Sequence, residues 1–183
     1  MTTLVGNSST KVPLRKDRRS VVAVVIEWRG KIALLKRSQR PAHDGGRWHC
    51  VTGFLEEGMS AGEQALLELH EETGLQLADI TELREGPVLM LSDAAGQLWF
   101  VHAFTAVTSR RRLTLDWEHD AIRWTLPSKT ARFANRVSWL DEVLRATGHL
   151  QPQTQNRADE TGSVSAGSWR RASDSVTDSR TYG

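Results

Sequence analysis

The chain has 183 residues, 39% hydrophobic and 25% charged, which is enough for one globular domain with extensions. Residues 1–19 carry a net charge of +4 and residues 151–183 a net charge of zero, so the total of +2 leaves −2 for the middle. The pI of about 9.0 therefore reflects a basic N-terminal arm, which argues against a nucleic-acid-binding face on the fold itself. No apolar run approaches the ~18 residues of a membrane-spanning helix, so no membrane partner is expected. Cys50 is the only cysteine, which excludes an intrachain disulfide and fits a cytoplasmic protein.

The first part of the chain alternates between strand-like and turn-like segments. Residues 1–19 are polar and are expected to form a mobile arm. Residues 20–28 are β-branched and apolar, and a turn at Arg29-Gly30 separates them from residues 31–36, so the two segments predict a β-hairpin. Residues 37–47 contain proline, aspartate and glycines and predict a loop. A short strand is expected at 48–52.

A helix is expected between Ser60 and Gly74. Ser60 followed by Glu63 is the pattern of a capping box, and Gly74 suits the left-handed position just past a helix end. At about 100° per residue, one stripe of this helix is apolar enough to face a core; it consists of Ala65, Leu66, Leu69 and Thr73.

Three carboxylates, those of Glu68, Glu71 and Glu72, occupy the adjacent arc of the same helix. Like charges this close repel each other unless something neutralises them. Mg²⁺ takes carboxylate oxygens and keeps waters and substrate phosphates as its other ligands, so the arc predicts a metal site that holds a pyrophosphate. The other interpretation is a solvated acidic helix face.

The second half of the chain predicts more strands and a final helix. Strands are expected at 76–85, 88–92, 99–108 and 121–124, with a turn at 93–96 and a helix at 136–147 that Gly148 ends. The strand at 99–108 should pair with the one before it. Residues 151–183 lack hydrophobic periodicity and are expected to be disordered. The domain is expected to span residues 20–150, with a mixed sheet between helices.

The segment from Gly53 to Leu75 resembles the Nudix box, the signature of the Nudix hydrolases. The residues that match are Gly53, Glu68, Leu69, Glu71, Glu72, Gly74 and Leu75. The box has Glu where this chain has Met59 and Arg where it has Leu67. The resemblance implies an α/β fold, a Nudix-like α/β/α sandwich with a mixed β-sheet.

The resemblance also implies a function. It implies a Nudix-type pyrophosphohydrolase in which Glu68, Glu71 and Glu72 coordinate Mg²⁺, or Mn²⁺, and Glu68 also takes part in activating water. The expected reaction is hydrolysis of a diphosphate linkage in a nucleoside triphosphate or in a nucleoside diphosphate linked to another moiety. Pairing is common among family members, which leaves both a monomer and a homodimer open.

The two departures from the box each remove a charge. In the family the Arg helps to hold the loop and orient the following Glu, so its replacement by Leu67 bears on Glu68. We hypothesise that Met59 and Leu67 contact each other, so that apolar packing replaces an ion pair. Two consequences are open: catalysis slower than usual, or a general base other than Glu68. The alternative function is a catalytically weak or inactive Nudix-fold module with a nucleotide-binding or regulatory role.

Further candidate residues lie outside the box. Many Nudix proteins carry a Glu in the loop before a short Trp-containing strand, which makes Glu118 a candidate base or metal ligand; the alternative is an ordinary loop carboxylate. Arg37, Arg40 and Arg47 are candidates to clamp substrate phosphates, against the alternative of a solvated basic loop. His119 is expected to face solvent or to hydrogen-bond, not to catalyse.

Overall fold

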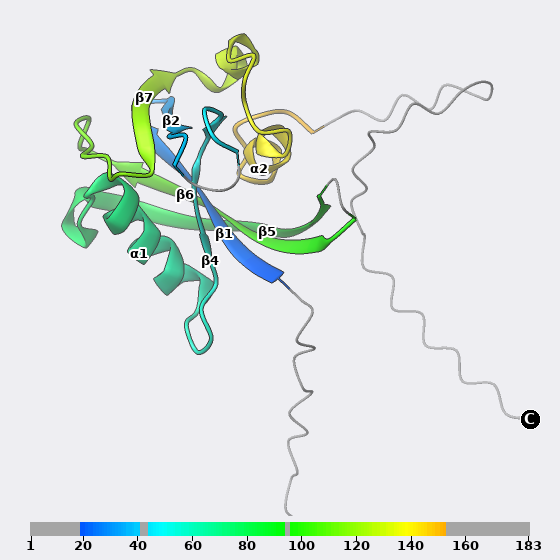
Figure 1. The fold of residues 1–183 in the computed structure, drawn as a ribbon. Coiled ribbons are helices and arrows are strands. Elements are labelled where there is room, and N and C mark those ends of the chain that lie inside the picture. Colours follow the sequence, from blue (N-terminus) through cyan, green and yellow to red (C-terminus); the bar gives the residue numbers. More distant parts are fainter. Residues whose placement is uncertain (1–18, 41–43, 94–95, 153–183) are drawn as a thin grey trace, which may run out of the picture.

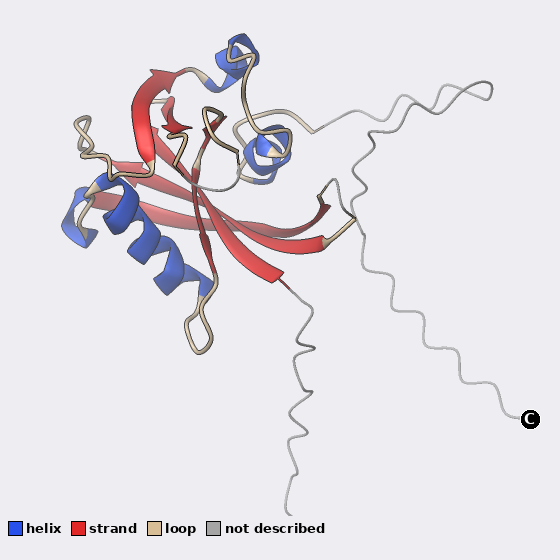
Figure 2. Cartoon of the chain, in the orientation of Figure 1, coloured by secondary structure: helices blue, strands red, loops and turns tan. Residues whose placement is uncertain are grey.

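The computed structural model describes residues 19–40, 44–93 and 96–152. Figure 1 shows the course of the chain, and Figure 2 shows how strands and helices divide it. The strands are β1 (Arg19–Trp28), β2 (Lys31–Arg37), β3 (Trp48–His49), β4 (Val51–Phe54), β5 (Ile80–Ser92), β6 (Leu98–Thr108) and β7 (His119–Thr125). The helices are α1 (Ala61–Thr73) and α2 (Leu140–Ala146), with short 3₁₀ turns at Leu77–Asp79 and Pro127–Arg132.

The strands form one mixed sheet. Its main order is β3-β2-β1-β6-β5, with β4 paired to β1 and β7 paired to β2. β1 and β6 run parallel, whereas the other pairs are antiparallel. The predicted hairpin of β1 with β2 and the predicted pairing of β5 with β6 are both confirmed.

The sheet lies between two helical layers, as the side chains of β1 show. Val22, Val24 and Ile26 pack in one core with residues of α1. Ala23 and Val25 pack in a second core with residues of α2. Successive strand residues point to opposite faces, so β1 supplies both cores, and Figure 1 shows α1 and α2 on opposite sides of the sheet. The predicted α/β/α sandwich is confirmed.

The ends of α1 are those that the sequence predicts. The Ser60 backbone N–H donates to Glu63 Oε2 at 2.9 Å, and the Glu63 backbone N–H donates to Ser60 Oγ at 3.3 Å, which completes the capping box. Gly74 has a φ of 67° and donates its N–H to the carbonyl of His70 at 2.8 Å. Because these signals are local, the boundaries of the helix could be predicted from sequence.

The strand predicted at 76–85 differs in the structure. Leu77–Asp79 forms a 3₁₀ turn, and β5 then runs unbroken to Ser92. Its register with β6 shifts between Glu85 and Val88, because a proline without an N–H interrupts the hydrogen-bonding pattern there. The shift marks an irregularity in the strand. A β-carbon on Gly86 would fall 2.8 Å from the Ala146 carbonyl oxygen, so only glycine lets the strand approach the end of α2 this closely.

The helix predicted at 136–147 begins only at Leu140. The residues before it are held by the sheet instead: Arg136 bridges to Trp48, and the Val137 N–H donates to the Trp48 carbonyl at 3.0 Å. A β-bridge requires extended backbone at Arg136, so the helix cannot include this residue. The predictions for the basic arm and the C-terminal tail, 1–18 and 153–183, fall outside the described residues. No helix in the described ranges is long and apolar enough to cross a membrane.

Candidate functional site

The acidic arc of α1 lines an open cleft of about 430 Å³. β4 forms one wall of the cleft, and the segment before β7 contributes to its lining. Six carboxylates line it, those of Glu56, Glu68, Glu71, Glu72, Asp116 and Glu118, whereas Arg37 is the one basic residue among the described residues that do so. This excess of negative charge favours a bound cation.

Glu68 lies against the backbone of β4. A β-carbon on Gly53 would fall 1.7 Å from Glu68 Oε1, so the carboxylate occupies space that only a glycine leaves open. Gln64 Nε2 donates a hydrogen bond to the same oxygen at 2.9 Å. Partial burial raises the pKa of Glu68, and the negative charges of Glu71 and Glu118 add to the rise, while the Gln64 hydrogen bond opposes it.

Glu72 is the buried member of the acidic arc, with 5% of its surface exposed. The backbone N–H of Thr52 donates to its Oε1 at 3.4 Å, whereas its buried Oε2 has no hydrogen-bond partner. Burial raises the pKa of Glu72 well above its ordinary value, and the charge of Glu68 raises it further. A buried carboxylate oxygen without a partner is costly, which makes it a natural ligand for a cation.

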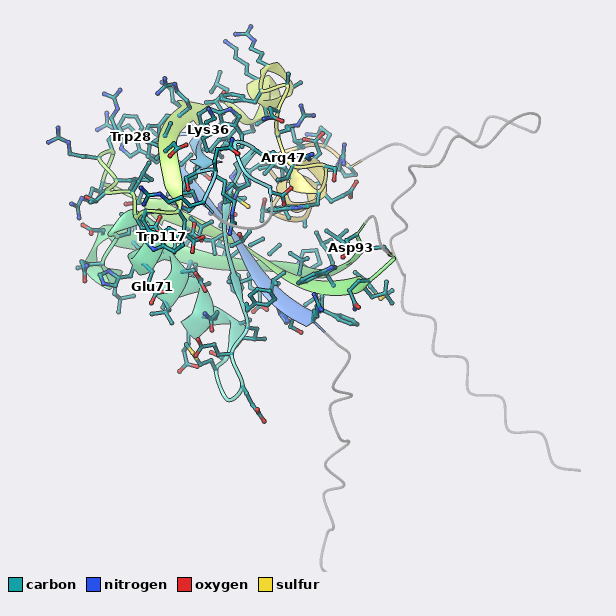
Figure 3. All side chains as sticks on the ribbon, in the orientation of Figure 1. Trp28, Lys36, Arg47, Glu71, Asp93 and Trp117 are labelled. Carbon is teal, nitrogen blue, oxygen red and sulfur yellow. The ribbon has the colours of Figure 1, made fainter. Side chains whose placement is uncertain are left out.

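Glu71 differs from its two neighbours because it is exposed at the mouth of the cleft. Figure 3 labels Glu71 on α1 and Trp117 in the segment before β7, the two elements that meet at the cleft. The three carboxylates thus share one helix arc but have three different environments, from buried to exposed.

Glu118 also lines the cleft, and Arg37 holds it there. Arg37 Nη2 lies 3.1 Å from Glu118 Oε2. Ser38 anchors the backbone of the same segment: its N–H donates to the Glu118 carbonyl at 2.7 Å and its Oγ to the Trp117 carbonyl at 3.2 Å. The loop before β7 is therefore fixed to the end of β2, with its carboxylate turned toward α1.

The structure brings one of the three candidate phosphate-binding arginines to the cleft. Arg37 is in its lining, whereas Arg40 and Arg47 are not. Arg47 Nε lies 3.6 Å from Asp44 Oδ1, and Figure 3 shows Arg47 well apart from Glu71. A role for Arg40 and Arg47 in substrate binding stays a prediction.

A buried pair of histidines lies behind the cleft. His119 is buried and hydrogen-bonded, with its Nδ1 2.8 Å from Asp116 Oδ1 and its Nε2 3.3 Å from His49 Nε2. Its Nε2 is also 3.5 Å from Glu72 Oε2. Burial lowers the pKa of His49 to about 3, and the electrostatic influence of the neighbouring His119 and Arg37 lowers it further. His49 is therefore neutral near pH 7.

Five residues of this site were not predicted from the sequence: His49, Thr52, Glu56, Gln64 and Asp116. His49 and Thr52 come from β3 and β4, and nothing in their local sequence distinguishes them from ordinary strand residues. Gln64 carries a usable signal, because it lies one turn before Glu68 on the same helix.

The donor set suits a hard divalent cation. All the candidate ligands on α1 are carboxylates, the preferred ligands of Mg²⁺, and one oxygen of Glu72 is buried and accepts no hydrogen bond. In the described ranges no three His, Cys, Asp or Glu side chains are already drawn together as a closed metal site. An open arrangement suits a cation that keeps waters and substrate phosphates among its ligands.

Known proteins share both the sequence pattern and the fold. The sequence model of the family described as NUDIX domain matches residues 16–147. The RNA pyrophosphohydrolase of Gluconacetobacter diazotrophicus is 32% identical over 143 residues, which cover 66% of this chain and 86% of that protein. The octanoyltransferase of Myxococcus xanthus is 33% identical over 118 residues, but these cover 63% of this chain and only 33% of that protein. The chain thus matches about a third of the octanoyltransferase.

A solved structure agrees in fold. The NUDIX domain of Shewanella oneidensis NrtR, complexed with ADP ribose, superposes with a TM-score of 0.59 at 19% identity. The superposition covers 72% of this chain and 87% of that one. At this low sequence identity, the superposition shows only that the two proteins share a fold, the α/β/α sandwich.

Proposed function

This chain belongs to the NUDIX domain family, and on that premise we propose that it is a Mg²⁺-dependent Nudix-type pyrophosphohydrolase. Its substrate would be a nucleoside triphosphate or a nucleoside diphosphate linked to another moiety, and the bond cleaved would be a diphosphate linkage. Membership of the family confirms the resemblance seen in the box. The identity of the cation, the substrate and the residue roles that follow belong to the proposal.

The convergence of Glu68, Glu71, Glu72 and Glu118 on one cleft is the observation that carries the proposal. Carboxylates held this close raise one another's free energy. Burial raises the pKa values of both Glu68 and Glu72, and this repulsion raises them further. A protein that keeps such a cluster needs a compensating positive charge. A divalent cation together with a diphosphate substrate supplies it.

Glu68, Glu71 and Glu72 would hold the cation. When bound, it neutralises charge on the phosphates and lowers the pKa of a bound water. Glu72 gives the most rigid ligand, because it is buried and Thr52 fixes its other oxygen. Glu71, which is exposed, gives the most adaptable one.

In the proposed reaction, the oxygen of a water molecule bonds to phosphorus and the bond from that phosphorus to the bridging oxygen breaks. The bridging oxygen leaves with the second phosphate, and the proton of the water passes to a carboxylate of the cleft. Glu68 and Glu118 are the two candidates for this carboxylate. They differ in their partners, since Glu68 accepts from a neutral amide and Glu118 from the Arg37 guanidinium.

Arg37 would have two partners, the Glu118 carboxylate and the substrate. Its guanidinium has several donors in a planar fork, and only Nη2 is committed to Glu118. Its Nε is buried and has no hydrogen-bond partner. We propose that Arg37 contacts a phosphate oxygen of the substrate while it keeps Glu118 in the cleft.

The second candidate function is a nucleotide-binding or regulatory module without turnover. Met59 and Leu67 favour it, because they replace the charged pair of the box. The buried Glu72 argues against it, because one of its oxygens accepts no hydrogen bond. A module that binds no metal would gain nothing from such a destabilising carboxylate.

A substrate panel tests the proposal. The protein is incubated with Mg²⁺ and nucleoside triphosphates, dinucleoside polyphosphates, nucleotide sugars, ADP-ribose and a 5′-triphosphorylated RNA, and the released products are separated by ion-exchange chromatography. We expect Mg²⁺-dependent hydrolysis of a diphosphate linkage in at least one class. Calorimetric binding of a member without any hydrolysis across the panel would favour the module.

Two further expectations rest on less: the homodimer on the family resemblance, and the location on the single cysteine. We propose that the protein forms a homodimer and that it is located in the cytoplasm. Size-exclusion chromatography with light scattering measures the mass in solution, where a value near twice the 20.5 kDa of one chain is expected. Fractionation of the source cells tests the location.

A further inference from the structure

Gln64 is a fully buried polar residue between the helix and the loop of the box. It lies on α1 with 2% of its surface exposed. A buried amide is costly unless its donor and its acceptor are both used. Both are used here: Oε1 accepts from the backbone N–H of Glu56 at 3.2 Å, and Nε2 donates to Glu68 Oε1 at 2.9 Å.

The two partners permit only one orientation of this amide. A backbone N–H can only donate and an ionised carboxylate can only accept. If the amide turned over, Nε2 would face the Glu56 N–H and Oε1 would face the Glu68 carboxylate, and both hydrogen bonds would be lost. Gln64 therefore ties one carboxylate oxygen of Glu68 to the backbone of the loop after β4 in a defined direction.

We propose that Gln64 is the positioning residue of the site, which holds the Glu68 carboxylate over Gly53 and couples it to the loop that follows β4. This inference rests on the proposed function, because the value of a fixed Glu68 depends on its role toward the cation and the water. Leu67, next to Glu68 in the chain, has no donor to offer, so the amide one helical turn earlier supplies the hydrogen bond.

Gly53 and Gln64 act on Glu68 from two sides. Gly53 leaves the space that the carboxylate fills, and Gln64 provides the hydrogen bond that keeps it there. The neutral amide stabilises the carboxylate without an added positive charge. The negative charge of Glu68 is thus not already offset by a basic side chain when a cation binds.

Two substitutions separate positioning from packing. Gln64→Met keeps the length of the side chain and removes both hydrogen bonds. Gln64→Glu keeps the acceptor for the Glu56 N–H but replaces the donor with a second negative charge beside Glu68. We expect kcat to fall about 10- to 100-fold in both, the usual consequence of a misplaced catalytic group, with KM changed less than about 3-fold. Gln151→Met, at an exposed residue, is the matched control.

A rescue experiment gives a readout that packing alone would not move. Leu67→Arg places a donor beside Glu68, so in the Gln64→Met background it should restore most of the lost kcat. In the wild-type background, where Glu68 is already held, the same change should alter kcat less than about 3-fold, because coupled residues do not act additively. An equal effect in both backgrounds would overturn the inference, as would a Gln64→Met protein with unchanged kcat.

A spectroscopic measurement tests the contact without any turnover. The side-chain NH₂ group of Gln64 gives a resolved pair of signals in a ¹H–¹⁵N correlation spectrum, assigned by its loss in Gln64→Met. Glu68→Ala should shift this pair, whereas Glu71→Ala, which lies three residues beyond Glu68 and makes no contact with Gln64, should not. No shift in Glu68→Ala would overturn the inference. If the wild type hydrolyses nothing in the panel, the proposed function fails, and these spectra still decide whether Gln64 holds Glu68.

Discussion

The carboxylate of Glu68 lies directly against the α-carbon of Gly53, so closely that any β-carbon at residue 53 would overlap it. Pairing with β1 fixes this position, since Gly53 lies opposite Val22 in the antiparallel register of β4. The glycine that opens the box and the glutamate near its end are therefore one structural unit. Their relationship gives the first prediction.

Gly53→Ala should reduce activity far more than stability. The added methyl group must displace Glu68, and we expect kcat to fall about 100-fold, as for other misplaced catalytic groups. The free energy of unfolding should fall by less than about 1 kcal/mol, below the usual range for overpacked cores, because the displaced side chain is half-exposed and can swing into the cleft. Kinetics and urea unfolding of the same preparation measure both.

Gly62→Ala is the matched control for that substitution. Gly62 lies on α1, and a β-carbon there would meet nothing within 4 Å. Alanine in a helix is more stable than glycine by about 0.5–1 kcal/mol, so this variant should be slightly more stable and equally active. A Gly53→Ala protein with the activity of Gly62→Ala would contradict the account of Glu68.

Glu72→Gln should make the protein more stable when no divalent cation is present. One oxygen of the buried carboxylate accepts no hydrogen bond, although His119 Nε2 lies 3.5 Å away, and the pKa of Glu72 is raised. Glutamine removes the charge, keeps an acceptor for Thr52 and offers an NH₂ donor on the side of His119. Leaving a buried polar group unpaired costs about 1–3 kcal/mol, so we expect a gain of that order in chelator-treated protein at pH 8, measured by urea unfolding.

The same variant should change how stability depends on pH. Above pH 4.5, the ordinary value for the carboxyl of Glu72 in an unfolded chain, the unfolded state has lost a proton that the folded state still binds. The free energy of unfolding therefore falls as pH rises toward the raised pKa. His49 acts in the opposite direction, because its lowered pKa makes the folded state bind fewer protons below pH 6.5. Subtracting the Glu72→Gln curve from the wild-type curve isolates Glu72, and the difference should grow with pH above 4.5.

Added Mg²⁺ should reverse the order of the two proteins. At a concentration of 100 times its Kd, a ligand that binds only the folded state stabilises it by about 2.7 kcal/mol. The wild type should gain this amount, and Glu72→Gln should gain much less. An equal gain in both proteins would show that the cation does not use Glu72.

Met59 and Leu67 should be energetically coupled if they form the apolar contact that the sequence predicts. Both side chains are half-buried. In a double-mutant cycle of Met59→Ala and Leu67→Ala, contacting residues typically give an interaction energy of at least about 0.5 kcal/mol. Chemical denaturation of the four proteins measures it, and strictly additive losses would reject the contact.

Cys50 should be unreactive in the folded protein. It is 1% exposed, and burial raises the pKa of its thiol to about 12, with a further contribution from the charge of Glu72. Because the thiolate is the reactive form, iodoacetamide should modify the protein only after unfolding. Mass spectrometry of native and urea-treated samples detects the adduct, and fast modification of the native sample would show that the site opens.

The sequence predicted α1 and its caps because those signals are local. Ser60, Glu63 and Gly74 each act within one helical turn of their own position, and the spacing of the glutamates places them on one arc without any knowledge of the rest of the fold. The late start of α2 could not be predicted, since it depends on the pairing of Val137 with Trp48, which is far away in the chain.

The degree of burial of the three glutamates could not be predicted from the sequence either. Spacing places Glu71 and Glu72 side by side on the helix, yet the wall formed by β4 buries one and leaves the other exposed. His49 and Asp116 reach the site through β3 and the segment before β7. Tertiary packing brings these two residues to the site, and no local sequence pattern predicts it.

The most direct test of the central claim is the Mg²⁺ dependence of hydrolysis in the wild type and in Glu72→Gln, both confirmed to be folded by circular dichroism. The substrate is the member of the panel that the wild type hydrolyses fastest. We predict that the wild-type rate rises with Mg²⁺ to a plateau and vanishes with chelator, and that Glu72→Gln loses at least about 100-fold in kcat. Hydrolysis that persists in chelator, or a Glu72→Gln protein as active as the wild type, would contradict the account.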